Sequence, residues 1–355
     1  MSTVVEPDAR APEPRRKFSL SSRGALRRLA LLGLVLLAAL AWCWFVTIRM
    51  PGRSWTGPLP PLTETETRLA GALREHVEVL AGQAGSRSLF YPRLQAEAAS
   101  YIRAALIGAG FADTAIAESF PERGTGAPNL EAAVEGTTHP NEIIVIGAHY
   151  DAFQGTPGAD DNASGVAALL ELARSFRHRP QPRTLRFVFF TNEEPPAFQT
   201  SDMGSWVYAK LCRGRADDVR AMLSLESIGY YSEAPGSQKY PFPFGLLYPS
   251  RGDFIGLIGN YGSRALVRRC VGAFRASTHF PCEGAAMPSL IPGVGWSDQW
   301  AFWQEGYPAL MVTCTAPFRN PHYHQPSDKP DTLDFERTAR VVAGLERLVI
   351  DLSSD

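Results

Sequence analysis

The stretch from Glu142 to Phe176, EIIVIGAHYDAFQGTPGADDNASGVAALLELARSF, decides the fold that we predict for this chain. It opens with the apolar run Ile143 to Ile146, which is typical of a strand buried on both faces of a sheet. A Gly/Pro-rich loop follows, and then Gly165 to Phe176, an Ala/Leu-rich segment that predicts a helix. Strand, loop and helix in this order indicate one unit of an α/β fold.

Polar residues cluster in the loop of this unit. His149 and Asp151 follow the apolar run directly, and Asp160, Asp161 and Asn162 precede the helix. Open α/β sheets bind ligands at the carboxyl ends of their strands. One interpretation is a strand-end histidine and an Asp pair that caps the helix. The other is half of a metal site, and the rest of the chain favours it.

The remaining chain repeats the alternation of strands and helices. We therefore predict an α/β domain with a mixed, mostly parallel central sheet flanked by helices. Residues 229–296 are rich in Tyr, Pro, Gly and Phe, and apart from one helix we expect loops there that cover a site. Helices are expected at 63–81, 93–110, 204–211, 263–276 and 335–352, and strands at 127–136, 183–191, 221–228 and 307–313.

Composition excludes several classes of protein. The 355 residues include 35 basic and 36 acidic side chains, so no nucleic-acid footprint is expected, and 45% apolar residues support a folded core. The five cysteines form no C-x-x-C pair, which excludes a zinc finger. Cys270 and Cys282 are close enough in sequence for a disulfide in an oxidising compartment, and two inert buried thiols are the alternative.

The N-terminal region predicts a membrane anchor. Leu29 to Ile48 is a run of 20 residues without a charge, long enough to cross a bilayer. Trp42 and Trp44 lie towards its far end, where an aromatic belt is expected. Residues 1–28 form a basic tail that should stay in the cytoplasm, so that the catalytic domain lies on the extracytoplasmic side. The basic side chains of this tail include Arg15, Arg16, Lys17, Arg23, Arg27 and Arg28, which precede the apolar run.

A cleaved signal peptide is the alternative to the anchor, and the protein would then be secreted. Ala39-Leu40-Ala41 matches the small-residue pattern of a cleavage site. The long leader and the apolar continuation past Ala41 favour the anchor. On this interpretation residues 29–48 span the membrane, residues 49–62 form a linker, and residues 63–355 form the catalytic domain.

Acidic residues also follow the other predicted strands. Glu193 and Glu194 come directly after the strand at 183–191, and a solvated loop is the alternative for this pair. Glu226 lies inside the apolar run at 221–228, where a charge is costly unless it is paired or bound to a metal. His324 follows the last strand.

Together these residues resemble the parts of a two-metal hydrolase. Carboxylates and neutral imidazoles are zinc ligands, and one Asp can bridge two ions. A further carboxylate must take the proton of the attacking water, and the adjacent pair Glu193 and Glu194 offers one base and one ligand. Asp151 is placed to orient the imidazole of His149. The candidates are His149, Asp161, Glu193, Glu194, Glu226 and His324.

The domain from about Thr63 to Leu352 resembles metallopeptidase family 28 of clan MH, the di-zinc aminopeptidases. The matching motifs, in the family's order, are GAHYD (147–151), PGADDNASG (157–165), NEE (192–194), SLESIG (224–229), WSD (296–298) and YHQPSD (323–328). The resemblance implies the di-zinc exopeptidase fold of that clan.

The resemblance also implies a role for each candidate. His149 and Glu226 would complete one zinc site, Glu194 and His324 the other, and Asp161 would bridge the two ions. Glu193 would be the general base and acid, and Asp151 would support catalysis. Two neighbours have lesser roles, since Asp160 would support the backbone geometry and His322 would lie at the rim.

Three positions depart from the family's pattern. Glu226 stands where Asp is common and is one methylene longer. Pro195 to Met203 replace a short Gly-rich turn, which should reshape the substrate pocket. Gln299 follows the WSD motif where His is frequent. None of these departures removes a ligand.

We therefore expect a membrane-anchored zinc aminopeptidase that hydrolyses N-terminal residues from peptides, with two Zn²⁺ ions as cofactors. Its partners would be a peptide substrate and the membrane, with no nucleic acid, and the sequence carries no signal for oligomeric state. A glutaminyl cyclase with a single zinc needs only Asp161, Glu194 and His324 and is the second enzyme hypothesis. A non-catalytic member of the fold is the third.

Overall fold

The computed structural model describes residues 23–83, 85–121 and 126–354 and divides into two units, residues 1–46 and 47–355. The described part of the first unit is the helix α1 (Arg23–Thr47), whose 25 residues are long and apolar enough to cross a membrane. It begins inside the predicted basic tail, whose residues 1–22 lie outside the described residues. It ends one residue before Ile48, the last residue of the predicted span.

The second unit is built on one mixed sheet with the strand order β1-β2-β4-β3-β5-β8-β6-β7. Four of its seven neighbouring pairs are parallel and three antiparallel, as the predicted fold class requires. The described strands are β1 (Ala117–Ser119), β2 (Asn129–Val134), β3 (His139–His149), β4 (Arg183–Phe190), β5 (Asp218–Glu226), β6 (Ile255–Asn260), β7 (Cys282–Met287) and β8 (Ala309–Thr313).

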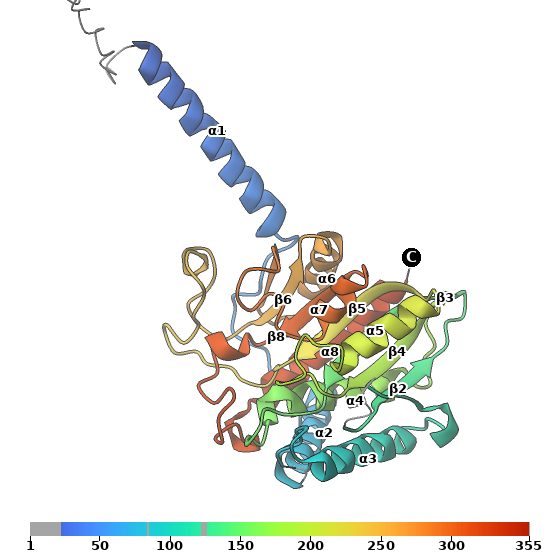
Figure 1. The fold of residues 1–355 in the computed structure, drawn as a ribbon. Helices are drawn as coiled ribbons and strands as arrows, with labels where there is room; N and C mark the ends of the chain where they lie inside the picture. The colour runs from blue at the N-terminus through green and yellow to red at the C-terminus, as the bar shows by residue number, and fades with distance from the viewer. Residues whose placement is uncertain (1–22, 84, 122–125, 355) are drawn as a thin grey trace, which may run out of the picture. The chain divides into compact units, whose positions relative to one another are not determined.

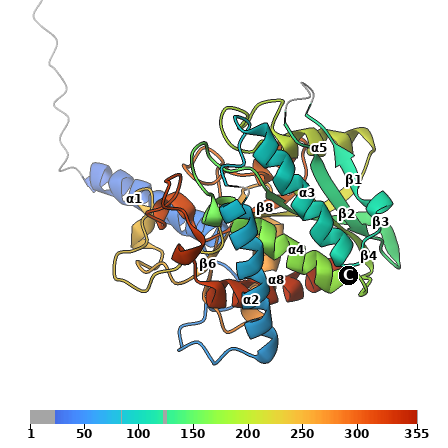
Figure 2. The same ribbon diagram turned by 90° about the horizontal axis from the view of Figure 1, so that it is seen from below.

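Helices cover both faces of the sheet (Figure 1). Successive side chains of β3 point to opposite faces of the sheet, and both faces are buried. Ile144 and Ile146 pack into the main hydrophobic core, while Ile143 and Val145 pack into a second hydrophobic cluster with side chains of α5 and α7. Figure 2 shows α2, α4 and α8 together on the face of the main core. The helices are α2 (Glu64–Glu78), α3 (Pro92–Gly108), α4 (Gly165–Phe176), α5 (Gly204–Gly214), α6 (Arg264–Ser277), α7 (Gln299–Gln304) and α8 (Phe335–Ser353).

Local sequence explains the helix boundaries. Thr63 caps α2 in a capping box with Glu66, and Leu73 and Val77 on the same face are buried. Pro92 opens α3, where its missing N–H costs nothing. The expectations for α4, β4 and α8 are confirmed to within one residue at either end.

The prediction for residues 229–296 is wrong in one respect. Two strands, β6 and β7, lie there and extend the sheet beyond β8. Their sequences, IGLIGN and CEGAAM, are short and rich in Gly and Ala, so the strand signal is weak. The short elements β1 and α7 were also not predicted.

The segment predicted as a linker, residues 49–62, packs against the core of the second unit. Met50 is buried in the main core, and Leu59 packs against the same core. The carbonyl of Pro60 accepts a hydrogen bond from Arg340 of α8. These contacts hold residues 49–62 against the core of the second unit.

The cysteine pair left open by the sequence is reduced. Cys270 and Cys282 are both free and fully buried, and burial raises the pKa of both thiols above the usual value. They are therefore inert core residues.

Candidate metal centre

The predicted site residues converge at one edge of the sheet. β4, β3, β5 and β8 are neighbours and run parallel, so their carboxyl ends lie side by side. His149 is the last residue of β3 and Glu226 the last of β5. Glu193 follows β4, and His324 lies in the loop after β8. This is the edge where α/β sheets bind their ligands.

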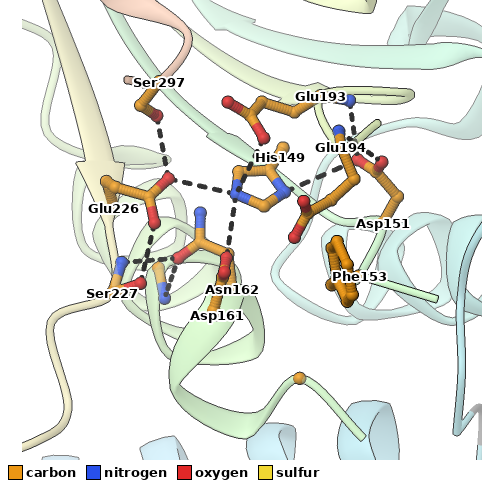
Figure 3. Close-up of polar contacts among 12 residues, drawn as sticks. His149, Asp151, Phe153, Asp161, Asn162, Glu193, Glu194, Glu226, Ser227 and Ser297 are labelled. Atoms are coloured by element: carbon orange, nitrogen blue, oxygen red, sulfur yellow. Dashed lines mark hydrogen bonds and ion pairs between the residues drawn. The ribbon is translucent and has the colours of Figure 1, made fainter. Parts of the chain in front are cut away.

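A first group of ligand atoms surrounds the imidazole of His149 (Figure 3). Its Nε2 atom lies 3.0 Å from Oε2 of Glu226 and 3.3 Å from Oδ1 of Asp161. Asp161 comes from the turn between β3 and α4, so three separate segments supply the group. All three side chains are buried.

A second group shares Asp161 with the first. The Nε2 atom of His324 lies 3.1 Å from Oδ2 of Asp161 and 3.4 Å from Oε1 of Glu194. Asp161 thus directs one oxygen to each group. Within each group the ligand atoms all lie within 4.8 Å of one another.

These residues fit metal ions by two observations. Asp161 Oδ1, Glu194 Oε1 and His324 Nε2 are buried and form no hydrogen bond with any described residue. Buried polar atoms without a partner are rare and costly. Here Asp161 Oδ1 faces the first group, and the other two atoms belong to the second. In addition, five buried carboxyl groups lie beside two imidazoles, and this excess of negative charge must be balanced by protons or metal cations. The carboxyl groups are those of Asp151, Asp161, Glu193, Glu194 and Glu226.

The pKa values reflect the same shortage of positive charge. Burial raises the pKa of Glu193 well above its usual value. The charge of His149 lowers this pKa, while the charges of Glu194 and Glu226 raise it further. Burial and the charge of Asp161 raise the pKa of Glu194 to about 8. Burial lowers the pKa of His324, yet Asp161 and Glu194 outweigh it and raise the value to about 10. Protons or metal cations can supply the missing charge.

Asp151 connects the first histidine with the glutamate pair. Its Oδ1 atom lies 3.5 Å from Nδ1 of His149. Its two oxygens accept hydrogen bonds of 3.0 Å from the backbone N–H groups of Glu193 and Glu194. The Glu193 carboxylate reaches to 3.9 Å from Nε2 of His149, beside the first group. Asp151 therefore holds both the imidazole and the loop that carries the glutamates.

Glu226 is fixed by two serines. Ser227 Oγ donates to its Oε1 at 2.7 Å, and Ser297 Oγ donates to its Oε2 at 2.8 Å. Ser297 also lies 3.1 Å from the hydroxyl of Ser224. These bonds hold the side chain that is one methylene longer than the aspartate common at this position.

The turn that carries Asp161 is bound by its neighbours. Asp328 accepts hydrogen bonds from the backbone N–H groups of Asp160 and Asp161, at 2.9 and 3.1 Å. Asp160 accepts hydrogen bonds from the backbone N–H of Gly229 at 2.8 Å and from Asn320 Nδ2 at 2.8 Å. Asp160 thus has the geometry-supporting position expected for it.

His324 is held between two aromatic rings. Phe153 and Tyr323 stack on it with centroid distances of 4.1 and 3.9 Å and nearly parallel planes, which places them on opposite faces. Its backbone is left-handed, with φ of 56°. His322 instead bonds to Ser327 at 2.9 Å and stays at the rim, as expected.

Arg87 was not predicted as part of the site. It is fully buried and donates to the carbonyls of Leu80, Tyr150, Pro157 and Gly158 at 2.7–2.9 Å. It thereby ties the end of the helical segment after α2 to both ends of the loop that follows β3. No local pattern marks this arginine, because its partners are backbone atoms distant in sequence.

An apolar cavity of about 110 Å³ opens beside Glu226 and Tyr323. Its walls come largely from residues 238–258 and 283–296, the region where loops over the site were expected. Residues 195–203, whose length was expected to reshape the pocket, do not line it. Its apolar lining includes Tyr240, Phe244, Tyr248, Phe254, Ile258, Ala285, Met287, Ile291, Val294 and Phe318.

Comparison with known proteins agrees with this geometry. A family model described as Peptidase family M28 matches residues 129–349. The uncharacterized protein YfbL of Escherichia coli is 42% identical over 235 residues, which cover 63% of this chain and 72% of YfbL. A probable aminopeptidase of Saccharomyces cerevisiae is 32% identical over 195 residues. That alignment covers 51% of this chain and 49% of the yeast protein, about half its length.

Solved structures share the fold. LapB of Legionella pneumophila aligns with a TM-score of 0.65 at 20% identity, over 85% of this chain and 79% of LapB. A glutaminyl cyclase of Bacteroides thetaiotaomicron aligns with a TM-score of 0.60 at 15% identity, over 82% of this chain and 99% of the cyclase.

These matches define a class, the metallo-aminopeptidases, on an α/β fold. The chain belongs to Peptidase family M28.

Proposed function

We propose that this chain is a membrane-anchored aminopeptidase that uses two zinc ions to remove N-terminal residues from peptides. The observation that carries the proposal is the position of Asp161, whose two oxygens each face a separate group of ligand atoms. His149 and Glu226 would complete one zinc site, and Glu194 and His324 the other. Aspartate, glutamate and histidine are ordinary zinc ligands.

Zinc ions held by these residues would polarise the scissile carbonyl and lower the pKa of a water molecule. Glu193 would take the proton of the attacking water on its carboxylate and deliver it to the nitrogen of the leaving amine. Asp151 would keep Glu193 in reach through its bond to the backbone N–H.

The cavity beside Glu226 gives a substrate preference. Its lining is almost entirely apolar, so we propose that it accepts the aliphatic or aromatic side chain of the N-terminal residue. The positively charged amino group of the peptide would meet the acid-rich centre next to it. The wall formed by β6 and β7 determines how large a side chain fits.

The N-terminal part of the proposal is an anchor. Helix α1 would cross the membrane, with the basic tail in the cytoplasm and the catalytic domain on the extracytoplasmic side. A signal sequence has the same length and composition, and its cleavage would release the domain.

A glutaminyl cyclase is the second candidate, because a solved cyclase shares the fold. That reaction needs only the group of Asp161, Glu194 and His324, by the resemblance described above. In this chain His149 and Glu226 lie within hydrogen-bond distance of each other, next to the same Asp161. This second group favours two metals and hydrolysis. A non-catalytic role would not require the buried Glu193 beside the ligands.

Metal analysis and a substrate panel test these alternatives on the full-length protein in detergent. Two zinc ions per chain together with release of p-nitroaniline from leucine and phenylalanine p-nitroanilides support the proposal. One zinc ion and cyclisation of an N-terminal glutaminyl peptide support the cyclase. A folded protein that binds no metal contradicts both enzymes.

A further inference from the structure

The chain enters the catalytic domain directly after α1. Helix α1 ends at Thr47, and the next residue, Ile48, packs against a cluster of Ala285, Met287 and Val294. Met50 follows and is only 8% exposed. A Cβ atom on Gly284 of β7 would lie 3.0 Å from Met50, so the segment lies directly against this strand. The attachment point is therefore one fixed place on the domain, beside the edge strand β7.

Hydrogen bonds hold the same segment in place. Arg275 of α6 donates to the carbonyl of Pro51 at 3.1 Å, and Arg268 donates to the carbonyl of Arg49. The backbone N–H of Cys282 donates to Ser54 Oγ at 3.0 Å. Residues 48–54 are thus bound to α6 and β7 of the domain.

The loops that meet at the Ile48 cluster also carry exposed apolar side chains. Phe244 and Tyr248 pack into that cluster, while Phe242 and Leu246 of the same loop are 90% and 81% exposed. Leu290 is 94% exposed, although the next residue, Ile291, packs into the cluster. Figure 1 shows the connection between β5 and β6, coloured yellow to gold, as a long loop. We call Phe242, Leu246, Leu247 and Leu290 the apolar rim.

Exposed apolar side chains at neighbouring loop tips mark a surface that contacts something apolar. If α1 crosses a bilayer, Ile48, the last residue of the predicted span, lies at the lipid–water interface, together with the loops packed around it. We propose that the apolar rim inserts into the leaflet from which α1 emerges and fixes the catalytic domain on the membrane surface. This inference rests on the proposed anchor and not on the peptidase activity.

The arrangement has a consequence for the substrate. Tyr240, Phe244 and Ile291 line the apolar cavity and belong to the loops that carry the rim. Docking of these loops on the membrane places the wall of the cavity at the lipid–water interface. Peptides with apolar N-terminal residues concentrate at the same interface, where their apolar side chains leave water.

The opposite edge of the sheet provides a matched control. β7 and β1 are the two edge strands, seven strand spacings apart, or about 34 Å at roughly 4.8 Å per strand. Phe120, directly after β1, is an exposed aromatic residue like Phe242, with 54% of its surface accessible. It should remain in water when the rim is in lipid.

Fluorescence quenching in proteoliposomes tests the proposal with the full chain. In a Cys43→Ser background, where the other cysteines are buried, Phe242→Cys, Leu290→Cys and Phe120→Cys are each labelled with a nitrobenzoxadiazole dye. The vesicles contain phosphatidylcholine and phosphatidylglycerol, with or without lipid spin-labelled near the headgroup. Hydrolysis of leucine p-nitroanilide and thermal unfolding verify that each labelled variant is folded.

We expect at least about twofold more quenching at positions 242 and 290 than at position 120, because interfacial side chains lie within roughly 5–10 Å of the headgroup boundary. Equal, weak quenching at all three positions in protein that resists carbonate extraction overturns the docking of the rim. Release of the protein by carbonate overturns the anchor, and with it this inference, without bearing on the peptidase activity.

Discussion

Replacement of Glu193 by Gln tests the proposed mechanism most directly. The amide has nearly the same shape as the carboxylate, and the bond from its backbone N–H to Asp151 remains. The ligand groups around His149 and His324 do not include Glu193, so both metals should stay bound. Only the capacity to accept and donate a proton is removed.

The expected loss follows from the role of a general base. Such groups contribute about 10²- to 10⁴-fold, which corresponds to roughly 2.7–5.4 kcal/mol in the activation free energy. We expect kcat of Glu193→Gln to fall about 10³-fold with KM changed less than about threefold, since the loss affects the transition state alone. Initial rates with leucine p-nitroanilide and metal analysis of the same preparation measure both quantities.

Glu194→Gln is the matched control, because the adjacent side chain belongs to a ligand group. It should lose metal as well as activity, whereas Glu193→Gln should lose activity alone. A Glu193→Gln variant that keeps two metals and more than about a tenth of the wild-type kcat would refute the assignment of the base. A Glu193→Gln variant that loses metal would show that Glu193 is a ligand.

Three further outcomes are expected. Zinc uptake at pH 7 should release more than one proton per chain. His324, with a pKa of about 10, and Glu194, with a pKa of about 8, are protonated below those values and must lose their protons to bind zinc, so the affinity for zinc falls as the pH falls. Calorimetry in buffers of different ionisation enthalpy counts the released protons, and zero release would contradict this expectation. Ala285→Leu fills part of the cavity and should lower kcat/KM for phenylalanine p-nitroanilide about tenfold, or ~1.4 kcal/mol, while alanine p-nitroanilide is hydrolysed as before. An equal loss for both substrates would contradict the proposal that the cavity accepts the N-terminal side chain. Arg87→Met should lower the free energy of unfolding by about 3 kcal/mol in urea titrations, because three buried carbonyls and the half-buried carbonyl of Pro157 lose a charged donor. A loss below about 1 kcal/mol argues against that role.

Two residues of the candidate site stand out because each interrupts or ends a strong local pattern. Glu226 is an acid at the end of an otherwise apolar strand, and His149 ends the strand that the opening stretch predicts. Parallel strands bring such ends to one edge of a sheet, so residues far apart in sequence had to meet there. Arg87 has no such signal, since its partners are backbone carbonyls on loops that only the fold brings together.

The sequence by itself determined the α/β class, the order of the long elements around α4 and the residue types of the candidate metal centre. Periodicity and strand length are local properties, and the buried segments of this chain are long enough to show them. Tertiary structure decided the rest. β6 and β7 are strands because β8 offers an edge to pair with, while their Gly- and Ala-rich sequences carry little strand preference. The packing of residues 49–62 against α6, β7 and α8 was also decided by the tertiary structure. The partners of this segment lie more than 200 residues away in sequence, so no local pattern predicts these contacts.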